Sequence, residues 1–202
     1  MLFCNCSQPN KINVMANFQI AYDITSIYEG GYANNPNDKG GETYKGIARN
    51  IETNWSGWAI IDSIKSKVGT NPNSINEAAG TNSELQQLVS NVFKSSYWDS
   101  LNLSLLQDQR IANKIYDVGV NMGVGTVAKF FQRALNIAAN DVLIVDGKIG
   151  NKTITSCNNL GVNDKLIVWK MINCLQGSRY IDIIEANQSQ RQFFRSWYSR
   201  VF

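Results

Sequence analysis

Apolar residues recur every three or four positions through most of this 202-residue chain, and this spacing constrains its fold more than any other feature. Such a period places the apolar side chains along one face of an α-helix, so the chain is expected to be predominantly helical. The predicted helices cover residues 18–29, 55–68, 83–97, 108–122 and 126–139, a short segment after Gly150, a long segment over 164–184 and a last one over 188–201.

Two segments lack the helical pattern. Residues 34–46 are rich in Asn, Pro, Asp, Gly and Thr, which predicts turns with a short irregular hairpin, the one plausible β element. Residues 69–81 are rich in Asn, Gly and Ser and are predicted to form a loop. The expected fold class is therefore α+β, predominantly α-helical.

Charge and hydropathy exclude several classes of partner. The net charge is +3 and the basic residues are scattered, so the clustered basic surface typical of a nucleic-acid binder is missing, and no nucleic-acid partner is expected. No apolar stretch has the length of a membrane span, so no integral membrane segment is expected. Residues 1–15 are predicted to be a disordered extension without a signal peptide, and Met15 is an alternative start.

The chain contains no histidine, which excludes a Ser-His-Asp triad, a Cys-His dyad and the usual histidine-bearing zinc sites. Its four cysteines, Cys4, Cys6, Cys157 and Cys174, have no zinc-binding spacing and are expected to be free thiols. No metal or cofactor is implied, and the remaining catalytic chemistry is that of carboxylates.

Glu29 ends the first predicted helix and is followed by Gly30 and Gly31. A carboxylate at a helix C-terminus faces the negative end of the helix dipole, which disfavours its ionised form and suits a proton donor. A Glu before two glycines is also typical of an ordinary exposed helix end. Cleavage of a glycosidic bond usually needs a second carboxylate, for which Asp38 is the nearest candidate, although it also fits a turn-forming Asp. Thr43 is a candidate for holding the water that Asp38 would activate.

The run Glu29-Gly-Gly-Tyr, followed by Asp38-Lys-Gly-Gly-Glu-Thr43-Tyr-Lys-Gly46-Ile47, resembles the opening signature of glycoside hydrolase family 108. That family comprises N-acetylmuramidases, including phage endolysins and proteins first described as secretion activators. Its essential glutamate is the one in this motif. The resemblance therefore implies that Glu29 is the catalytic acid and that the fold is lysozyme-like.

The resemblance continues to the end of the chain, through Tyr97-Trp98-Asp99 and Tyr116-Asp117-Val-Gly-Val-Asn121. It implies a catalytic lobe over 16–124 and, over 125–202, a helical predicted peptidoglycan-binding module, either separate or packed into the same core. The spacing of Glu29 and Asp38 is also similar to that in the inverting lysozymes of T-even phages, but Thr43 comes one residue too early. Inversion would require carboxyl groups roughly 6.5 to 9.5 Å apart.

Five further residues are candidates for contacting the glycan, and each has a structural alternative. Tyr32, Tyr44 and Trp98 are candidates for stacking on sugars, or they are packing residues beside turns. Asp117 and Asn121 lie four apart on one helix face and either line the cleft or satisfy buried backbone groups near Gly119 and Gly123.

The sequence thus predicts a peptidoglycan hydrolase that cleaves the β-1,4 bond between N-acetylmuramic acid and N-acetylglucosamine. The glycan strand would bind in a cleft between the first helix with its turn segment and the later helices. Two alternatives remain, namely a lytic transglycosylase and a non-catalytic wall-binding or secretion-assisting protein. We expect a monomer that is made in the cytoplasm and reaches the wall through phage holin pores.

Overall fold

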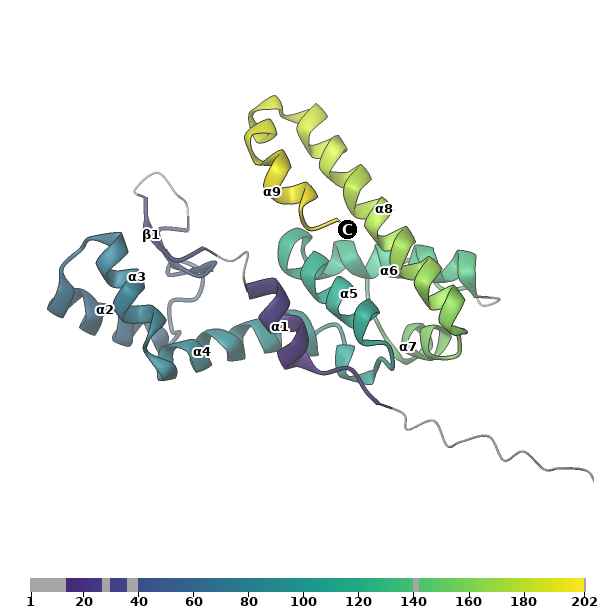
Figure 1. Ribbon diagram of the computed structural model, residues 1–202, viewed down its shortest axis with the longest axis horizontal. Coiled ribbons are helices and arrows are strands. Elements are labelled where there is room, and N and C mark those ends of the chain that lie inside the picture. The colour runs from purple at the N-terminus through teal and green to yellow at the C-terminus, as the bar shows by residue number, and fades with distance from the viewer. Residues whose placement is uncertain (1–13, 27–29, 36–39, 140–141, 202) are drawn as a thin grey trace, which may run out of the picture.

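The computed structural model describes residues 14–26, 30–35, 40–139 and 142–201, which form two lobes of unequal size (Figure 1). The smaller lobe holds a β-sheet with two helices, the larger lobe consists of helices, and helix α4 connects them. Of the predicted disordered extension over 1–15, residues 1–13 lie outside the described part of the chain. The elements are α1 (Phe18–Ser26), β1 (Tyr32–Asn34), β2 (Glu42–Tyr44), β3 (Ile47–Ala48), α2 (Gly57–Val68), α3 (Pro72–Gly80), α4 (Ser83–Phe93), η1 (Lys94–Asp99), η2 (Leu103–Leu105), α5 (Gln109–Met122), α6 (Val124–Ala138), α7 (Asn151–Asn158), α8 (Val162–Ala186), η3 (Gln188–Phe193) and α9 (Phe194–Tyr198).

The sheet of the small lobe is antiparallel, in the order β1-β2-β3, with Tyr32 opposite Tyr44 and Thr43 opposite Ala48. Because side chains alternate along a strand, Tyr32, Tyr44 and Ile47 lie on one face and are buried. Thr43 lies on the opposite face. The predicted β element is therefore present, as three short strands rather than a hairpin.

The predicted loop over residues 69–81 is wrong, because Pro72–Gly80 forms helix α3. The Asn71 side chain accepts hydrogen bonds from the backbone N–H groups of Asn73 and Ser74, and Pro72 occupies the first helical position. Both features are standard ways to begin a helix. Ile75 and Ala79 then anchor α3 in the core, where both are fully buried.

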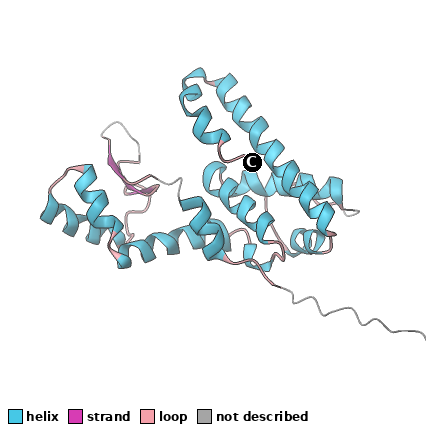
Figure 2. Ribbon diagram, in the orientation of Figure 1, coloured by secondary structure: helices cyan, strands magenta, loops and turns pink. Residues whose placement is uncertain are grey.

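Helix α5 forms the centre of the large lobe, with α1, α6 and α8 packed around it. Its buried residues include Ile111, Ile115 and Tyr116, which belong to one core that also contains residues of α6, α7 and α8. The C-terminal helices therefore share their core with α5. Helices dominate the described chain (Figure 2), which confirms the predicted, predominantly helical α+β class.

Two predicted helices are subdivided in the structure. Helix α4 ends at Phe93 and continues as a π-helical segment, η1, over Lys94–Asp99. The helix predicted over 188–201 consists of a 3-10 segment, η3, followed by the short α9. Among the described helices, none is long and apolar enough to cross a membrane.

Candidate active site

Gly31 shows why the motif Glu29-Gly-Gly-Tyr needs its second glycine. The side-chain oxygen of Asn76, on α3, accepts a hydrogen bond of 2.6 Å from the backbone N–H of Tyr32. A Cβ atom on Gly31 would collide with that oxygen, whereas a Cβ on Gly30 would meet nothing within 4 Å. Gly31 therefore permits a close approach that fastens the start of β1 to α3.

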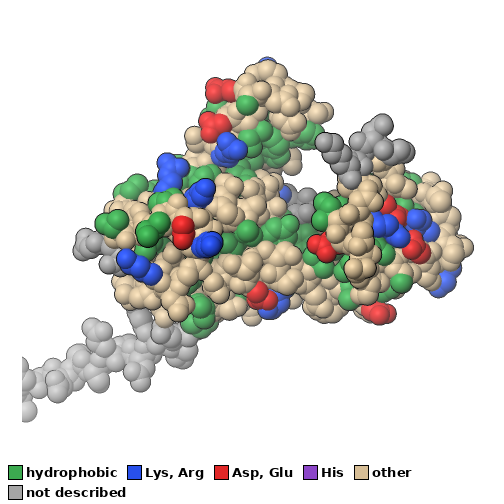
Figure 3. Space-filling model, turned by 180° about the vertical axis from the view of Figure 1, so that it is seen from behind, with side chains coloured by type: hydrophobic (Ala, Val, Ile, Leu, Met, Phe, Trp, Pro, Cys, Tyr) green, Lys and Arg blue, Asp and Glu red, His purple; other side chains and the backbone are tan. Residues whose placement is uncertain are grey.

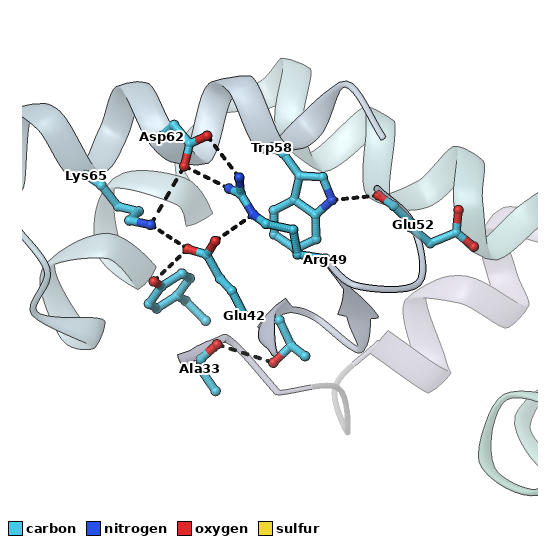
Figure 4. Close-up of polar contacts among 9 residues, drawn as sticks. Ala33, Glu42, Arg49, Glu52, Trp58, Asp62 and Lys65 are labelled. Atoms are coloured by element: carbon cyan, nitrogen blue, oxygen red, sulfur yellow. Dashed lines mark hydrogen bonds and ion pairs between the residues drawn. The ribbon is translucent and has the colours of Figure 1, made fainter. Parts of the chain in front are cut away.

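Glu42 of β2 lies at the centre of a network of charged groups (Figure 4). Its carboxylate accepts a 2.7 Å hydrogen bond from the Tyr32 hydroxyl and forms ion pairs with Lys65 at 2.7 Å and Arg49 at 2.6 Å. Asp62 of α2 completes the network through a 2.7 Å ion pair with Arg49. The network binds the sheet to α2.

The surroundings of Glu42 determine its protonation. Burial alone would raise the pKa of this carboxyl, but hydrogen bonds from Lys65 and Tyr32 and the charge of Arg49 outweigh burial and lower the pKa below its ordinary value. A carboxyl held ionised in this way is a poor proton donor. Its ion pairs and hydrogen bonds suit Glu42 to joining the sheet to α2 rather than to donating a proton.

Glu29 and Asp38, the predicted acid and its predicted partner, lie outside the described residues. Thr43, the third predicted catalytic residue, is half-buried, and its hydroxyl donates a long 3.4 Å hydrogen bond to the carbonyl oxygen of Ala33 across the sheet. Such a weak bond leaves this hydroxyl able to take another partner. Its predicted role in holding water stays a prediction.

Lys45, which the sequence analysis did not single out, lies where the two lobes meet. Its side chain shares a closely packed recess with Thr25 and Ser26, the last residues of α1, and its Nζ donates a 2.7 Å hydrogen bond to Gln86 of α4. Its backbone N–H donates to the carbonyl of Gly31 at 3.1 Å. Burial lowers the pKa of the Lys45 amine. Lys45 thus links the sheet, α4 and the end of α1.

The three aromatic candidates are buried. Tyr44 is 1% exposed and its hydroxyl accepts a hydrogen bond from Gln86, while Tyr32 is 6% exposed. Trp98 has no exposed surface and its indole N–H donates to Ser104 at 2.7 Å. Both Tyr44 and Trp98 are packed inside the protein, and neither ring has a face that a sugar could reach.

Asp117 and Asn121 line two different pockets. Asp117 lines an open pocket of about 280 Å³ between α1, α5 and α8, where Arg200 pairs with it at 2.9 Å. Asn121 lines a pocket beside α9 and accepts a 2.7 Å hydrogen bond from the Tyr180 hydroxyl. Both residues thus bond to side chains from the C-terminal part of the chain. These bonds do not involve the backbone near Gly119 and Gly123.

An open groove lies between the two lobes (Figure 3). Seen from behind, the molecule is hollowed between the small lobe and the projecting end of the large lobe that α8 and α9 form (Figure 3). A groove between two lobes suits an extended polymer. Within the described part of the chain, no group of three or more acidic or cysteine side chains is placed to hold a metal ion.

Comparison with known proteins identifies the class of this protein as a glycoside hydrolase, and also identifies its family. The family model described as "Glycosyl hydrolase 108" matches residues 22–123, and that described as "Predicted Peptidoglycan domain" matches residues 126–202. The chain belongs to glycosyl hydrolase family 108 and acts on peptidoglycan. No curated protein matches it.

A solved structure, described as "Structure of Brucella abortus SagA", shares the fold. It is similar with a TM-score of 0.57 and 17% sequence identity over 91% of this chain and 88% of that chain. At this identity the similarity concerns the fold alone. The predicted lysozyme-like α+β fold is confirmed.

Proposed function

We propose that this enzyme is an N-acetylmuramidase. It hydrolyses the β-1,4 bond between N-acetylmuramic acid and N-acetylglucosamine, with Glu29 donating a proton to the leaving oxygen and Asp38 directing the attacking water. Thr43, on the face of β2 opposite Glu42, helps to hold that water.

The observation that carries this proposal is that the partly buried carboxylates of the described residues are all paired with cations. Glu42, Asp108 and Asp117 have side chains that are 9%, 17% and 13% exposed, and each forms an ion pair with Arg or Lys. A proton donor has to hold its proton near neutral pH, which a neighbouring cation opposes. Glu29, at the position of the family's essential glutamate, supports the assignment of the acid.

Lysis of cells tests the proposal directly. The turbidity of outer-membrane-stripped cells is followed with wild type, Glu29→Gln and a matched control, Glu52→Gln, whose side chain is exposed. Loss of a general acid is expected to slow lysis by about 100-fold or more, with wall binding retained. Equal lysis by wild type and Glu29→Gln would overturn the assignment and favour a non-catalytic, wall-binding role.

The products distinguish hydrolysis from the closest alternative reaction. A lytic transglycosylase closes an anhydro ring on muramic acid, whereas a muramidase adds water and leaves a reducing end. Mass spectrometry of digested peptidoglycan is expected to show reducing muropeptides, and mainly anhydro products would defeat the muramidase proposal. Lysis in the turbidity assay would also support a bacteriolytic, endolysin-type role.

A further inference from the structure

A pocket of about 290 Å³ lies between the start of α6 and the end of the large lobe that α8 and α9 form. The described residues that line it all belong to the large lobe, so it is separate from the sheet and from the Lys45 recess. Its wall combines an amide, a hydroxyl, a cation and an aromatic ring, contributed by Asn121, Thr126, Arg179 and Trp197. This mixture of groups is typical of a ligand site.

A chain of hydrogen bonds fixes the amide of Asn121. Gln176 donates from Nε2 to the Tyr180 hydroxyl at 3.1 Å, and that hydroxyl donates to Asn121 Oδ1 at 2.7 Å. Burial raises the pKa of Tyr180 to about 12, so the hydroxyl keeps its proton under physiological conditions. Because the amide oxygen is engaged, the amide NH₂ of Asn121 is left to meet an acceptor in the pocket.

A stack of rings forms one side of the pocket. Trp197 stacks on the buried Tyr180, with ring centroids 5.0 Å apart and 17° between the planes, and Phe193 stacks on Trp197 at 5.9 Å. The rings lead from the core to the surface, since Tyr180 is 1% and Phe193 is 43% exposed. Because Tyr180 and Phe193 stack against it, the indole of Trp197 is held rigidly and offers the pocket an apolar edge for a methyl group.

The charge of the pocket favours an anion. Arg179 is exposed and is the only charged side chain among the described residues that line it. The 15-residue helix α6 begins at Val124, close to the lining residue Thr126, and the preceding Gly123 offers no side-chain hydrogen bond to its first turn. The dipole of α6 therefore adds a partial positive charge to that of Arg179.

We propose that this pocket binds the stem peptide of peptidoglycan through a free carboxylate, an inference that rests on the proposed action on the wall. Arg179 pairs with the carboxylate, the amide of Asn121 donates to a peptide carbonyl, and Trp197 packs against the peptide's small apolar groups. A neutral glycan offers no charge for Arg179, whereas the stem peptide offers carboxylates, amides and methyl groups together. The large lobe thereby holds the peptide while the glycan lies between the lobes.

Binding of small fragments tests this site without interference from hydrolysis. The probes are N-acetylglucosaminyl-N-acetylmuramoyl tetrapeptide and the same disaccharide with its lactyl carboxyl capped as a simple amide, which leaves it neutral. Neither probe contains the bond that the enzyme is proposed to cleave. Isothermal titration of the full-length wild type is expected to give at least about tenfold tighter binding of the peptide-bearing probe. Equal affinity for the two probes would overturn the proposal.

Variants locate the binding to the pocket. Arg179→Gln is expected to abolish the preference for the peptide-bearing probe, whereas Arg133→Gln, the same change on the exposed side of α6, is expected to preserve it. Asn121→Asp keeps an acceptor for Tyr180 but replaces the NH₂ donor with a negative charge, so it too should remove the preference. A preference that survives Arg179→Gln would overturn the site.

The peptide-binding test and the lysis test can fail independently of each other. If wild type lyses cells and shows no peptide preference, the pocket is wrong and the muramidase proposal stands. If wild type shows the preference and Arg179→Gln removes it while neither lyses cells, the pocket is supported and the muramidase proposal fails.

Discussion

Asp117 of α5 and Arg200, 83 residues further along the chain, form an ion pair in which Arg200 Nε lies 3.0 Å and Nη2 lies 2.9 Å from Asp117 Oδ1. Lys114, also on α5, donates a 2.6 Å hydrogen bond to the backbone carbonyl of Arg200. Asp117 belongs to the segment that matches the glycosyl hydrolase, and Arg200 to the segment that matches the peptidoglycan domain. Side chains of both segments therefore hold the C-terminal end of the chain against the central helix.

Removing the charge of Asp117 is expected to destabilise the protein. In Asp117→Asn the guanidinium of Arg200, whose side chain is 7% exposed, loses its ion pair with the Asp117 carboxylate. Breaking a buried ion pair on one side typically costs about 3 kcal/mol. Urea unfolding should show this loss, with Asp182→Asn, an exposed position on α8, as the matched control that stays near wild type. Equal stability of the two variants would contradict the role of this pair.

Neutralising Glu42 is expected to reduce stability without removing catalysis. Glu42→Gln leaves Lys65 and Arg49 without their shared carboxylate, and the loss of hydrogen bonds to a charged group typically costs about 2 kcal/mol. The melting temperature should fall by several degrees, while turnover measured well below it should stay within a few-fold of wild type. A complete loss of lysis by folded Glu42→Gln would instead give this carboxylate a catalytic role.

Lys114 is expected to make stability rise with pH above neutrality. Burial lowers the pKa of its amine from 10.5 to about 8 in the folded protein. Between these values the unfolded chain binds the proton and the folded protein does not, so the free energy of unfolding increases with pH. Lys114→Met should remove this contribution. Urea unfolding of both proteins at several pH values from 7 to 10 gives the difference, and a difference that does not change with pH would contradict it.

Much of the fold could be predicted because the apolar spacing of an amphipathic helix is visible in the local sequence. Helices α2, α5, α6 and α8 carry regularly spaced apolar residues and lie where the period predicts them. Helix α3 was missed because it is short and buries only Ile75 and Ala79 among polar residues, although Asn71 and Pro72 carried the signal for its start.

The candidate site was less predictable because its contacts depend on tertiary packing. Nothing local to Glu42 indicates that Lys65, 23 residues later, will neutralise it, and the burial of Trp98 follows from its contacts with Phe18 and Tyr116. Glu29 and Asp38 were recognisable from their motif alone. Their catalytic roles remain predictions.

Thr43 is expected to act through its hydroxyl if it holds the attacking water. Thr43→Ala removes the hydroxyl from the half-buried face of β2, whereas Thr43→Ser keeps it and deletes only a methyl group. Initial rates on purified peptidoglycan should fall by about tenfold or more in Thr43→Ala and recover largely in Thr43→Ser. If the two variants have equal rates, the hydroxyl has no part in the reaction.

Asp38 determines the stereochemical outcome in the proposed reaction. When it directs a water to the face opposite the leaving group, cleavage of the β bond gives the α-anomer first, and proton NMR of a fresh digest should show that anomer before it equilibrates. Asp38→Asn should slow hydrolysis by about 100-fold or more because the amide cannot accept the water's proton. Asp62→Asn, at the exposed edge of the Glu42 network, is the matched control and should keep its activity. Initial release of the β-anomer would show retention and would replace the water-directing role of Asp38 with a nucleophilic one.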